Sequence, residues 1–362
     1  MKQFLSIFAF FFVFQRIICC SDSITTASGP FAPARICSGE LIFEENFDKF
    51  DLDLWNHEVS LYGGYNGEFQ WYTNHRDNTF AQDGKLFVMP TLTYKYLPCN
   101  CPESLTSYTL DLLKEEPFVC TNADREGCFM QGTSEEIINP VRSGRIKTDN
   151  GFRFKYGKVE VRAKVPRGPF LWPAVWMMPA ESVYGGWPNS GEIDIMESRG
   201  NKQILTKNGE EIGNRRALQT LHFGNGWQHH EYRETNNLND EEFGKDFHLF
   251  KLEWTPEHIK FQTDDFPERI LNSPFQGNYT GSENEIAPFD QEFYFIINLA
   301  VGGTHGYFPD DAEYAPELKP YRNDDGRRVG QTKYWNANTW KGIEKDPEGS
   351  SLQVDYIKVW AL

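Results

Sequence analysis

The segment KVEVRAKV, residues 158–165, alternates strictly between charged and apolar side chains. Its valines and alanine share one parity, its charged residues take the other, and the run stops at Pro166. A period of two is typical of a strand with one buried face, and proline ends such a strand because it has no N–H to donate. Similar strand-like runs recur at 247–254, 258–264, 293–301 and 352–360.

Turn-forming clusters separate these runs, among them NGEF, DGK, GGWPNSG and FGNGW. Helical periodicity is scarce, and the best helix candidate is LTSYTLDLLKEE, residues 105–116. Many short strands without alternating helices favour an antiparallel sandwich or jelly roll, so we predict an all-β fold. No internal repeat, low-complexity tract or linker divides the chain, which indicates a single domain over residues 23–362.

The N-terminus, MKQFLSIFAFFFVFQRIICCSDS, combines a lysine, an apolar run from Phe4 to Phe14 and a small, polar end. This layout is typical of a secretory signal peptide, which we place at residues 1–22, with cleavage between Cys20 and Ser23. The apolar run is shorter than the roughly 20 residues that a membrane anchor needs. We therefore expect a secreted, extracellular protein without a membrane anchor.

Cysteines cluster in one stretch of the chain. Beyond the predicted signal peptide they stand at Cys37, Cys99, Cys101, Cys120 and Cys128. In an oxidising compartment these are disulfide candidates, and four of them would staple an insertion near 94–130. Their number is odd, so either one thiol is free or Cys20 survives processing, and the spacing leaves the pairing open. The sequon Asn278-Tyr279-Thr280 predicts a glycan on Asn278, in a surface loop.

The net charge of the chain limits the kinds of ligand that it can be expected to bind. With 36 Lys and Arg against 52 Asp and Glu, the chain carries a net charge of −16. Phosphate backbones, anionic membranes and polyanionic polysaccharides would be repelled, so we expect no nucleic-acid partner. Aromatic residues make up 15% of the chain, and surface tryptophan suits stacking on the apolar faces of sugar rings. A neutral polysaccharide, bound by a monomer, is the expected partner.

The segment GEIDIMES places carboxylates at Glu192, Asp194 and Glu197. In a regular strand Glu197 would point away from the other two, but a β-bulge at Ile195 or Met196 would return it to their face. The two glutamates would then lie about 13 Å apart at Cα. Their carboxyls could converge to the roughly 5–5.5 Å of a retaining glycosidase.

A solvated acidic face and a calcium site are the alternative interpretations of these three acids. The isoleucines between the acids indicate that one face of this strand is buried. The preceding segment LWPAVWMMP carries Trp172 and Trp176 with equal parity. Paired indoles beside three carboxylates favour a sugar-binding site over a solvated acidic face or a calcium site, although either indole could belong to the core.

Several segments of the sequence resemble those of a known family. GEIDIME is similar to the E-x-D-x-x-E signature of glycoside hydrolase family 16, in its laminarinase-like branch. Further segments resemble the family's blocks in the family's order: LIFEENFDKFDLDLW, NGEFQWYT, SGRIKT, FKYGKVEVRAKVPRG, TLHFG, FHLFKLEWTPEHIKF, FYFIINLAVGG and LQVDYIKVW. The chain looks most like animal β-1,3-glucanases and the β-1,3-glucan-binding proteins related to them.

The resemblance implies a jelly-roll sandwich of two curved antiparallel sheets with a concave glycan-binding cleft. It also implies retaining hydrolysis, with Glu192 as nucleophile, Glu197 as acid and base, and Asp194 assisting both. Non-catalytic relatives typically replace one or both glutamates, which this sequence retains. We therefore expect a secreted retaining endo-β-1,3-glucanase. The alternatives are a non-catalytic β-1,3-glucan recognition protein of innate immunity and a transglycosylase.

Sugar contacts are also implied by the resemblance, and each has a structural interpretation beside the functional one. The candidates are Trp172, Trp176, Trp187, His222, Asn66, Arg145 and Asn298. His222 is expected near the reacting sugar and the acid/base. The segment His229-His230-Glu231 lacks a spaced metal partner, and we interpret it as a loop. No cofactor or metal is expected, except that Asp355 could join a structural calcium, as in some relatives.

Overall fold

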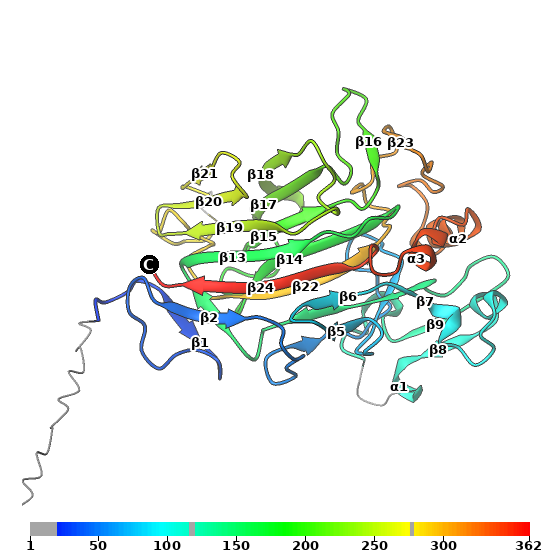
Figure 1. Ribbon diagram of the computed structural model, residues 1–362, viewed down its shortest axis with the longest axis horizontal. Coiled ribbons are helices and arrows are strands. Elements are labelled where there is room, and N and C mark those ends of the chain that lie inside the picture. The colour runs from blue at the N-terminus through cyan, green and yellow to red at the C-terminus, as the bar shows by residue number, and fades with distance from the viewer. Residues whose placement is uncertain (1–19, 116–119, 276–278) are drawn as a thin grey trace, which may run out of the picture.

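The computed structural model describes residues 20–115, 120–275 and 279–362. Two large sheets dominate it, and both contain only antiparallel pairs (Figure 1). The nine-stranded sheet runs in the order β1-β12-β22-β14-β15-β17-β18, with β11 and β3 beside β22. The eight-stranded sheet runs β21-β20-β19-β13-β24-β6-β5, with β2 beside β24. This arrangement confirms the predicted all-β sandwich.

The strands of the nine-stranded sheet are β1 (Thr26–Ser28), β3 (Asn56–His57), β11 (Arg145–Lys147), β12 (Arg153–Lys155), β14 (Leu171–Pro179), β15 (Glu192–Ser198), β17 (Arg216–Gly224), β18 (His230–Leu238) and β22 (Phe293–Val301). Those of the eight-stranded sheet are β2 (Leu41–Glu45), β5 (Thr79–Ala81), β6 (Leu86–Val88), β13 (Gly157–Lys164), β19 (His248–Trp254), β20 (His258–Thr263), β21 (Arg269–Asn272) and β24 (Leu352–Trp360).

The core lies between these two sheets. In β13 every second residue is buried, so the alternation of KVEVRAKV corresponds to one face packed and one face open. Rings from the two sheets meet in the interior: Trp254 lies edge-on to Phe293 at 5.4 Å, and Phe43 stacks on Phe295 at 6.1 Å between ring centroids. The face of the nine-stranded sheet that points away from this core is left for the candidate site.

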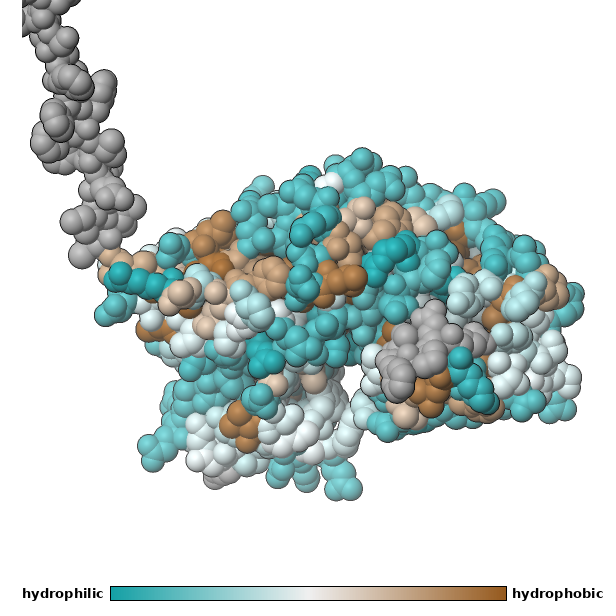
Figure 2. Space-filling view, turned by 90° about the horizontal axis from the view of Figure 1, so that it is seen from below, coloured by the Kyte–Doolittle hydropathy of each residue, from teal (hydrophilic) through white to brown (hydrophobic). Residues whose placement is uncertain are grey.

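A smaller unit adjoins the sandwich. It contains β4 (Gln70–Tyr72), β10 (Val141–Ser143) and β7 (Thr91–Leu92), with β4 and β10 parallel. The cysteine-rich insertion follows β7 and pairs β8 (Thr109–Asp111) with β9 (Phe129–Gln131). A second apolar cluster, which includes Leu105, Leu110 and Met130, fills its interior. In Figure 1 this unit lies at the right-hand end of the sandwich, and Figure 2 shows a notch between two lobes of the molecule.

The predicted helix at 105–116 is wrong in most of its length. The segment forms a 3-10 helix over Pro102–Thr106, then β8, and only then one helical turn, α1 (Leu112–Glu115). Pairing of β8 with β9 buries Leu110, and this tertiary contact outweighs the local helical preference.

Two helices near the C-terminus had no sequence signal. They are α2 (Arg327–Asn336) and α3 (Lys341–Lys345). The buried face of α2 consists of Gly330, Gln331 and Tyr334, so it shows no apolar stripe. The remaining short strands, β16 (Gln203–Leu205) and β23 (Glu313–Ala315), pair with each other.

The disulfides are Cys20–Cys37, Cys99–Cys101 and Cys120–Cys128. They confirm the expectation of a stapled insertion and use Cys20 as the sixth partner. Cleavage after residue 22 would remove one half of the first bond, so the signal-peptide boundary stays a prediction. Among the described residues, no helix has the length and apolar character to cross a membrane.

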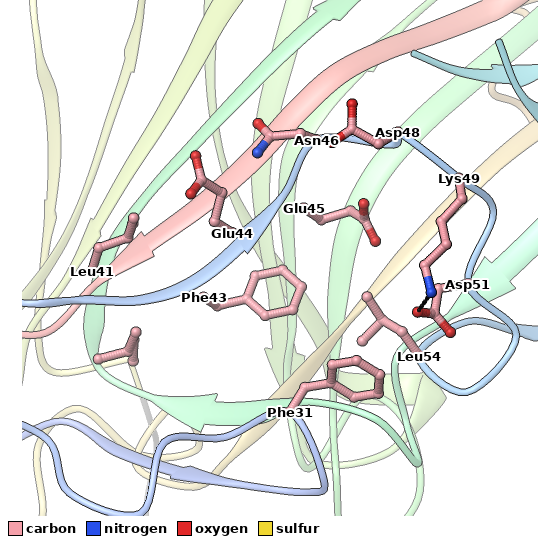
Figure 3. A pocket seen from close by; sticks show the side chains of 11 residues that line it. Phe31, Leu41, Phe43, Glu44, Glu45, Asn46, Asp48, Lys49, Asp51 and Leu54 are labelled. Atoms are coloured by element: carbon pink, nitrogen blue, oxygen red, sulfur yellow. Dashed lines mark ion pairs between the residues drawn. The ribbon is translucent and has the colours of Figure 1, made fainter. Parts of the chain in front are cut away.

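A cavity of about 490 Å³ lies beside β2 (Figure 3). Phe31, Phe43 and Leu54 give it an apolar side, and acidic side chains of the same segment line the rest. Lys49 lies 3.0 Å from Asp51, as the dashed line in Figure 3 marks. None of the residues predicted for catalysis or sugar binding lines this cavity.

Candidate active site

The predicted bulge is present in β15. Asp194 pairs with Thr220 of β17 and Glu197 pairs with Leu218, so Ile195 and Met196 together oppose one residue. On the other side, β14 pairs with Asp194 and Met196 and leaves Ile195 without a partner. The extra residue resets the alternation, and Glu197 joins the face of Glu192 and Asp194. Ile193, Ile195 and Met196 are fully buried in the core on the opposite side.

Each glutamate of this face receives one indole N–H. Trp187, in the loop before β15, donates to Glu192 Oε2 at 2.7 Å. Trp172, on the neighbouring β14, donates to Glu197 Oε1 at 2.8 Å. Such bonds fix the rotamer of each carboxyl and stabilise its ionised form. Trp172 and Trp187 therefore orient the two glutamates, in addition to any contact with sugar.

His222 stands opposite Glu192 on β17. Its Nε2 lies 3.2 Å from Asp194 Oδ2, and its Nδ1 lies 2.8 Å from Nε2 of His230. His230 is the first residue of β18. The interpretation of His229-His230-Glu231 as a loop is therefore wrong for His230 and Glu231, because the strand begins directly after His229 and both residues pair with β17.

The acids differ in protonation from free side chains. Burial, followed by the charge of Asp194, raises the pKa of Glu197 to about 8. Burial and the charge of Glu192 raise the pKa of Asp194 to about 7. Burial also raises the pKa of Glu192, although the positive charge of His222 and the bond from Trp187 oppose the rise.

The pKa of His222 is raised to about 9. Burial alone would lower it, but the contact with Asp194 and the negative charges of Asp194, Glu192 and Glu197 outweigh burial. At neutral pH the site thus combines a protonated acid, Glu197, with an imidazolium beside the other two carboxyls. That division of roles between two glutamates is what acid-assisted displacement at a sugar requires.

A second polar group shares this face of the sheet. Trp176 donates its indole N–H to Asn298 Oδ1 at 2.7 Å, and the guanidinium carbon of Arg145 lies 4.9 Å from the Trp176 ring centroid. Arg145 is adjacent to Asn298 through the β11–β22 pairing and forms an ion pair with Glu58 at 3.2 Å. Trp176 is half-buried, so one part of its ring stays open.

Asn66 lies on the loop before β4 and donates to Glu68 at 3.4 Å. Its backbone carbonyl accepts the N–H of Thr304. A Cβ at Gly303 would approach that carbonyl to 3.2 Å and the Trp172 ring to 3.9 Å, so this loop borders Trp172. The loop is brought near the site, while the Asn66 side chain is engaged by Glu68.

Tyr307 and Arg199 are two further residues of the site that the sequence did not predict. The Tyr307 ring stacks on Trp172, with centroids 3.6 Å apart and planes 4° apart, and the guanidinium of Arg199 lies 4.0 Å from the Tyr307 ring centroid. One face of Trp172 is thus covered within the protein. Arg199 lies two residues after Glu197, and Tyr307 follows β22 by six residues, so no local pattern links them.

Trp227 and Tyr65 were also missed. The Trp227 ring lies 4.3 Å from Trp187 and 5.5 Å from Tyr65, and the guanidinium of Arg125, in the insertion, lies 4.9 Å from the Tyr65 ring centroid. Both rings are exposed, Trp227 to 58% and Tyr65 to 46%. A row of aromatic rings therefore runs from the candidate active site toward the insertion. The glycine-rich stretches YGGYNG and FGNGW are the only local signal for it.

Glu192, Asp194 and His222 offer ligand atoms within 4.8 Å of one another, a spacing that could hold a metal ion. Each of the three is engaged by another side chain of the site. Asp355, the candidate calcium ligand, contacts the guanidinium of Arg162 and belongs to no group of three metal-binding side chains among the described residues. Asn278, the predicted glycosylation site, lies outside the described residues.

Comparisons with known proteins agree with this geometry. A family model described as "Glycosyl hydrolases family 16" matches residues 114–287 of this chain. A β-1,3-glucan-binding protein of Penaeus monodon is 40% identical over 89% of this chain and 90% of its own length. A glucan endo-1,3-beta-glucosidase of Cryptopygus antarcticus is 33% identical over 73% of this chain and 81% of its own length.

The fold has relatives of known structure as well. The laminarinase from Rhodothermus marinus superimposes with a TM-score of 0.56 at 24% identity, over 90% of this chain and 98% of its own. At that identity the likeness speaks for the jelly-roll fold alone. Taken with the 40% identity over nine tenths of a relative's length, it leads to one conclusion: the chain belongs to family 16 of the glycosyl hydrolases.

Proposed function

We propose that this protein is a secreted, monomeric, retaining endo-β-1,3-glucanase that hydrolyses laminarin-like glucans. The observation that carries the proposal is the bulge in β15, which brings Glu192, Asp194 and Glu197 to one face. Each glutamate there has its own indole donor. Burial and the charge of Asp194 raise the pKa of Glu197 to about 8, and this supports its role as the proton donor.

In the first step Glu197 donates its proton to the glycosidic oxygen while ionised Glu192 attacks the anomeric carbon. The bond to the leaving sugar breaks, and a covalent ester to Glu192 forms. The His222 imidazolium favours the ionised form of Glu192. In the second step Glu197, now ionised, removes a proton from water. The water oxygen attacks the same carbon and releases the Glu192 carboxylate, so the anomeric configuration is retained.

The nucleophile is tested by Glu192→Gln. This change should lower kcat on laminarin by roughly a thousandfold or more, since amides do not form the ester, while circular dichroism and Tm remain close to wild type. Glu181→Gln, at an exposed glutamate, is the matched control and should retain full reducing-sugar release. Wild-type turnover in Glu192→Gln would contradict the assignment.

The acid/base and the covalent intermediate are tested together by Glu197→Ala. With a nitrophenyl laminaribioside, whose leaving group needs no proton, the variant should form the ester and then stall. Azide, which needs no base, should attack the anomeric carbon, release Glu192 and give a β-glycosyl azide. Azide should accelerate Glu197→Ala and leave the wild type unchanged. An α-glycosyl azide would indicate inversion instead.

The second candidate function is non-catalytic recognition of β-1,3-glucan. The 40% identity to a protein named for glucan binding favours it. A wild-type protein that binds insoluble β-1,3-glucan but releases no reducing sugar would establish this function in place of hydrolysis. Products longer than the starting oligosaccharide would indicate transglycosylation.

A further inference from the structure

His230 and His222 form a pair on neighbouring strands, with Nε2 of His230 2.8 Å from Nδ1 of His222. The ring centroids lie 5.0 Å apart, and the planes are inclined by 22°. We propose that His230 is a positioning residue of the candidate active site: it accepts a hydrogen bond from the imidazolium of His222 and holds that charge beside Asp194 and Glu192. The kinetic part of this inference rests on the proposed function, and the titration part does not.

The two contacts of His222 limit its protonation. Nε2 lies 3.2 Å from Asp194 Oδ2, an ion-pair distance at which ionised Asp194 favours the protonated ring. Nδ1 faces a nitrogen of His230, and at 2.8 Å one of these two nitrogens must donate and the other accept. If both rings were cationic, two N–H groups would oppose each other. One positive charge fits the pair, and two do not.

The charge belongs on His222. Three carboxyls, those of Asp194, Glu192 and Glu197, act on this ring and raise its pKa to about 9. Burial and the charge of His222 lower the pKa of His230 below its usual value. His222 therefore donates through Nδ1, and neutral His230 accepts through Nε2, with its own proton on Nδ1.

Besides burial, the charge of His222 is the influence that acts on the pKa of His230. From β17 it faces His222, and along β18 it faces Tyr232 at 6.1 Å between centroids. From the loop before β15 it packs on Trp187 at 4.8 Å. Trp187 is also the donor to Glu192, so His230 supports the nucleophile along two routes, through His222 and through Trp187.

The consequence is a fixed positive charge behind the nucleophile. Without an acceptor at His230, the Nδ1–H of His222 would lose its partner, and the imidazolium would be less favourable in this buried place. The pKa of His222 would fall, and Glu192 would lose part of the charge that favours its ionised form. The same loss follows in the wild type when acid protonates His230 itself.

Two substitutions distinguish the hydrogen-bond acceptor of His230 from the size of its ring. His230→Gln keeps an acceptor near the place of Nε2 and cannot titrate, whereas His230→Phe keeps the ring and has no acceptor. NMR titration of isotope-labelled histidine should show the pKa of His222 lowered by about one to two pH units in His230→Phe. It should be restored in His230→Gln. His229→Phe, at the exposed neighbouring histidine, is the matched control and should leave His222 unchanged.

Kinetics on laminarin supply the second readout. His230→Phe should lower kcat about tenfold, equivalent to 1.4 kcal/mol, with KM little changed. His230→Gln should recover most of kcat and show a less steep loss of activity toward acid pH. The inference is overturned if His222 titrates as in the wild type in His230→Phe, or if the Gln and Phe variants behave alike. If the wild type hydrolyses no glucan, the proposed function fails, while the NMR titration still decides the role of His230.

Discussion

Glu192 and Glu197 show how two like residues of one strand acquire different chemistry. Both side chains are half-buried, and both carboxyls accept one indole N–H. The difference lies in the charges around them. The positive charge of His222 is the main influence against burial on the pKa of Glu192, which stays raised, whereas the negative charge of Asp194 adds to burial at Glu197 and outranks the effect of His222 there. In the proposed mechanism, the neighbouring side chains therefore decide which glutamate is the acid and which the nucleophile, since the two side chains are chemically identical.

The alkaline limb of activity should report on Glu197. The proton that it must donate is lost as pH rises, so kcat should fall through a pKa of about 8. Trp172→Phe removes the N–H that stabilises the ionised form. The pKa of Glu197 should then rise, and the alkaline limb should move to higher pH. The test is to measure kcat against pH for the wild type and Trp172→Phe. A shift of the alkaline limb toward lower pH would contradict the assignment of Glu197 as the acid.

Much of this residue-scale arrangement could be predicted from the sequence. The spacing of Glu192, Asp194 and Glu197 permits a common face only through an extra residue, so it dictated the bulge. The partners of these acids could not be predicted in the same way. Trp172 was expected to offer a face to sugar, but one face is covered by Tyr307 and its N–H points to Glu197. Such directions depend on strand register and loop paths, which composition does not encode.

At the scale of elements, the turn between β17 and β18 extends the site. Its Trp227 lies between Trp187 and Tyr65 and is bonded to none of the acids. Gly226, with a φ of 73°, turns the chain just before it and donates its N–H to Asn189. The turn is thus held to the loop that carries Trp187, and the exposed Trp227 indole lies beside the Trp187 ring that donates to Glu192.

Trp227→Ala should weaken substrate binding more than chemistry. An indole stacked on a sugar supplies contact area that alanine lacks, so KM for laminarin should rise several-fold to about tenfold with kcat nearly unchanged. Phe129→Ala, at an exposed ring on β9, is the control and should leave both constants near wild type. A fall in kcat alone in Trp227→Ala would show that the indole acts on the acids.

The packing of the insertion against α2 could not be predicted from the sequence of either element. Its stapling by cysteines could be predicted, but its partner could not. Arg327 and Gln331 of α2 donate to the carbonyls of Leu61 and Ile137, which belong to the same apolar cluster as Leu105 and Leu110 of the insertion. Both contacts join segments about 200 or more positions apart. A helix that buries polar residues to make such bonds carries no apolar period by which to recognise it.

At the scale of the whole molecule, we expect the net charge of −16 to favour neutral over anionic polysaccharides. A neutral glucan has no charge to be screened, so KM for laminarin should stay constant between about 0.05 and 0.5 M NaCl. A carboxymethylated β-1,3-glucan should be a poorer substrate at low salt and should improve as salt screens the repulsion. Initial rates on the two polymers across salt give the test. A salt-dependent KM for laminarin would show that charge takes part in binding.

The extra residue in β15 also sets how such a chain can change under mutation. Under the proposed function, a single substitution at Glu192 or Glu197 would remove hydrolysis, while the backbone pairing of β15 with β14 and β17 does not depend on either side chain. The opposite route, from a regular strand to this one, needs a residue inserted into the middle of a sheet. On that proposal, one substitution is enough to lose hydrolysis. One substitution is also enough to regain it, for as long as the bulge persists. A lineage that gives up catalysis but keeps the insertion retains a way back.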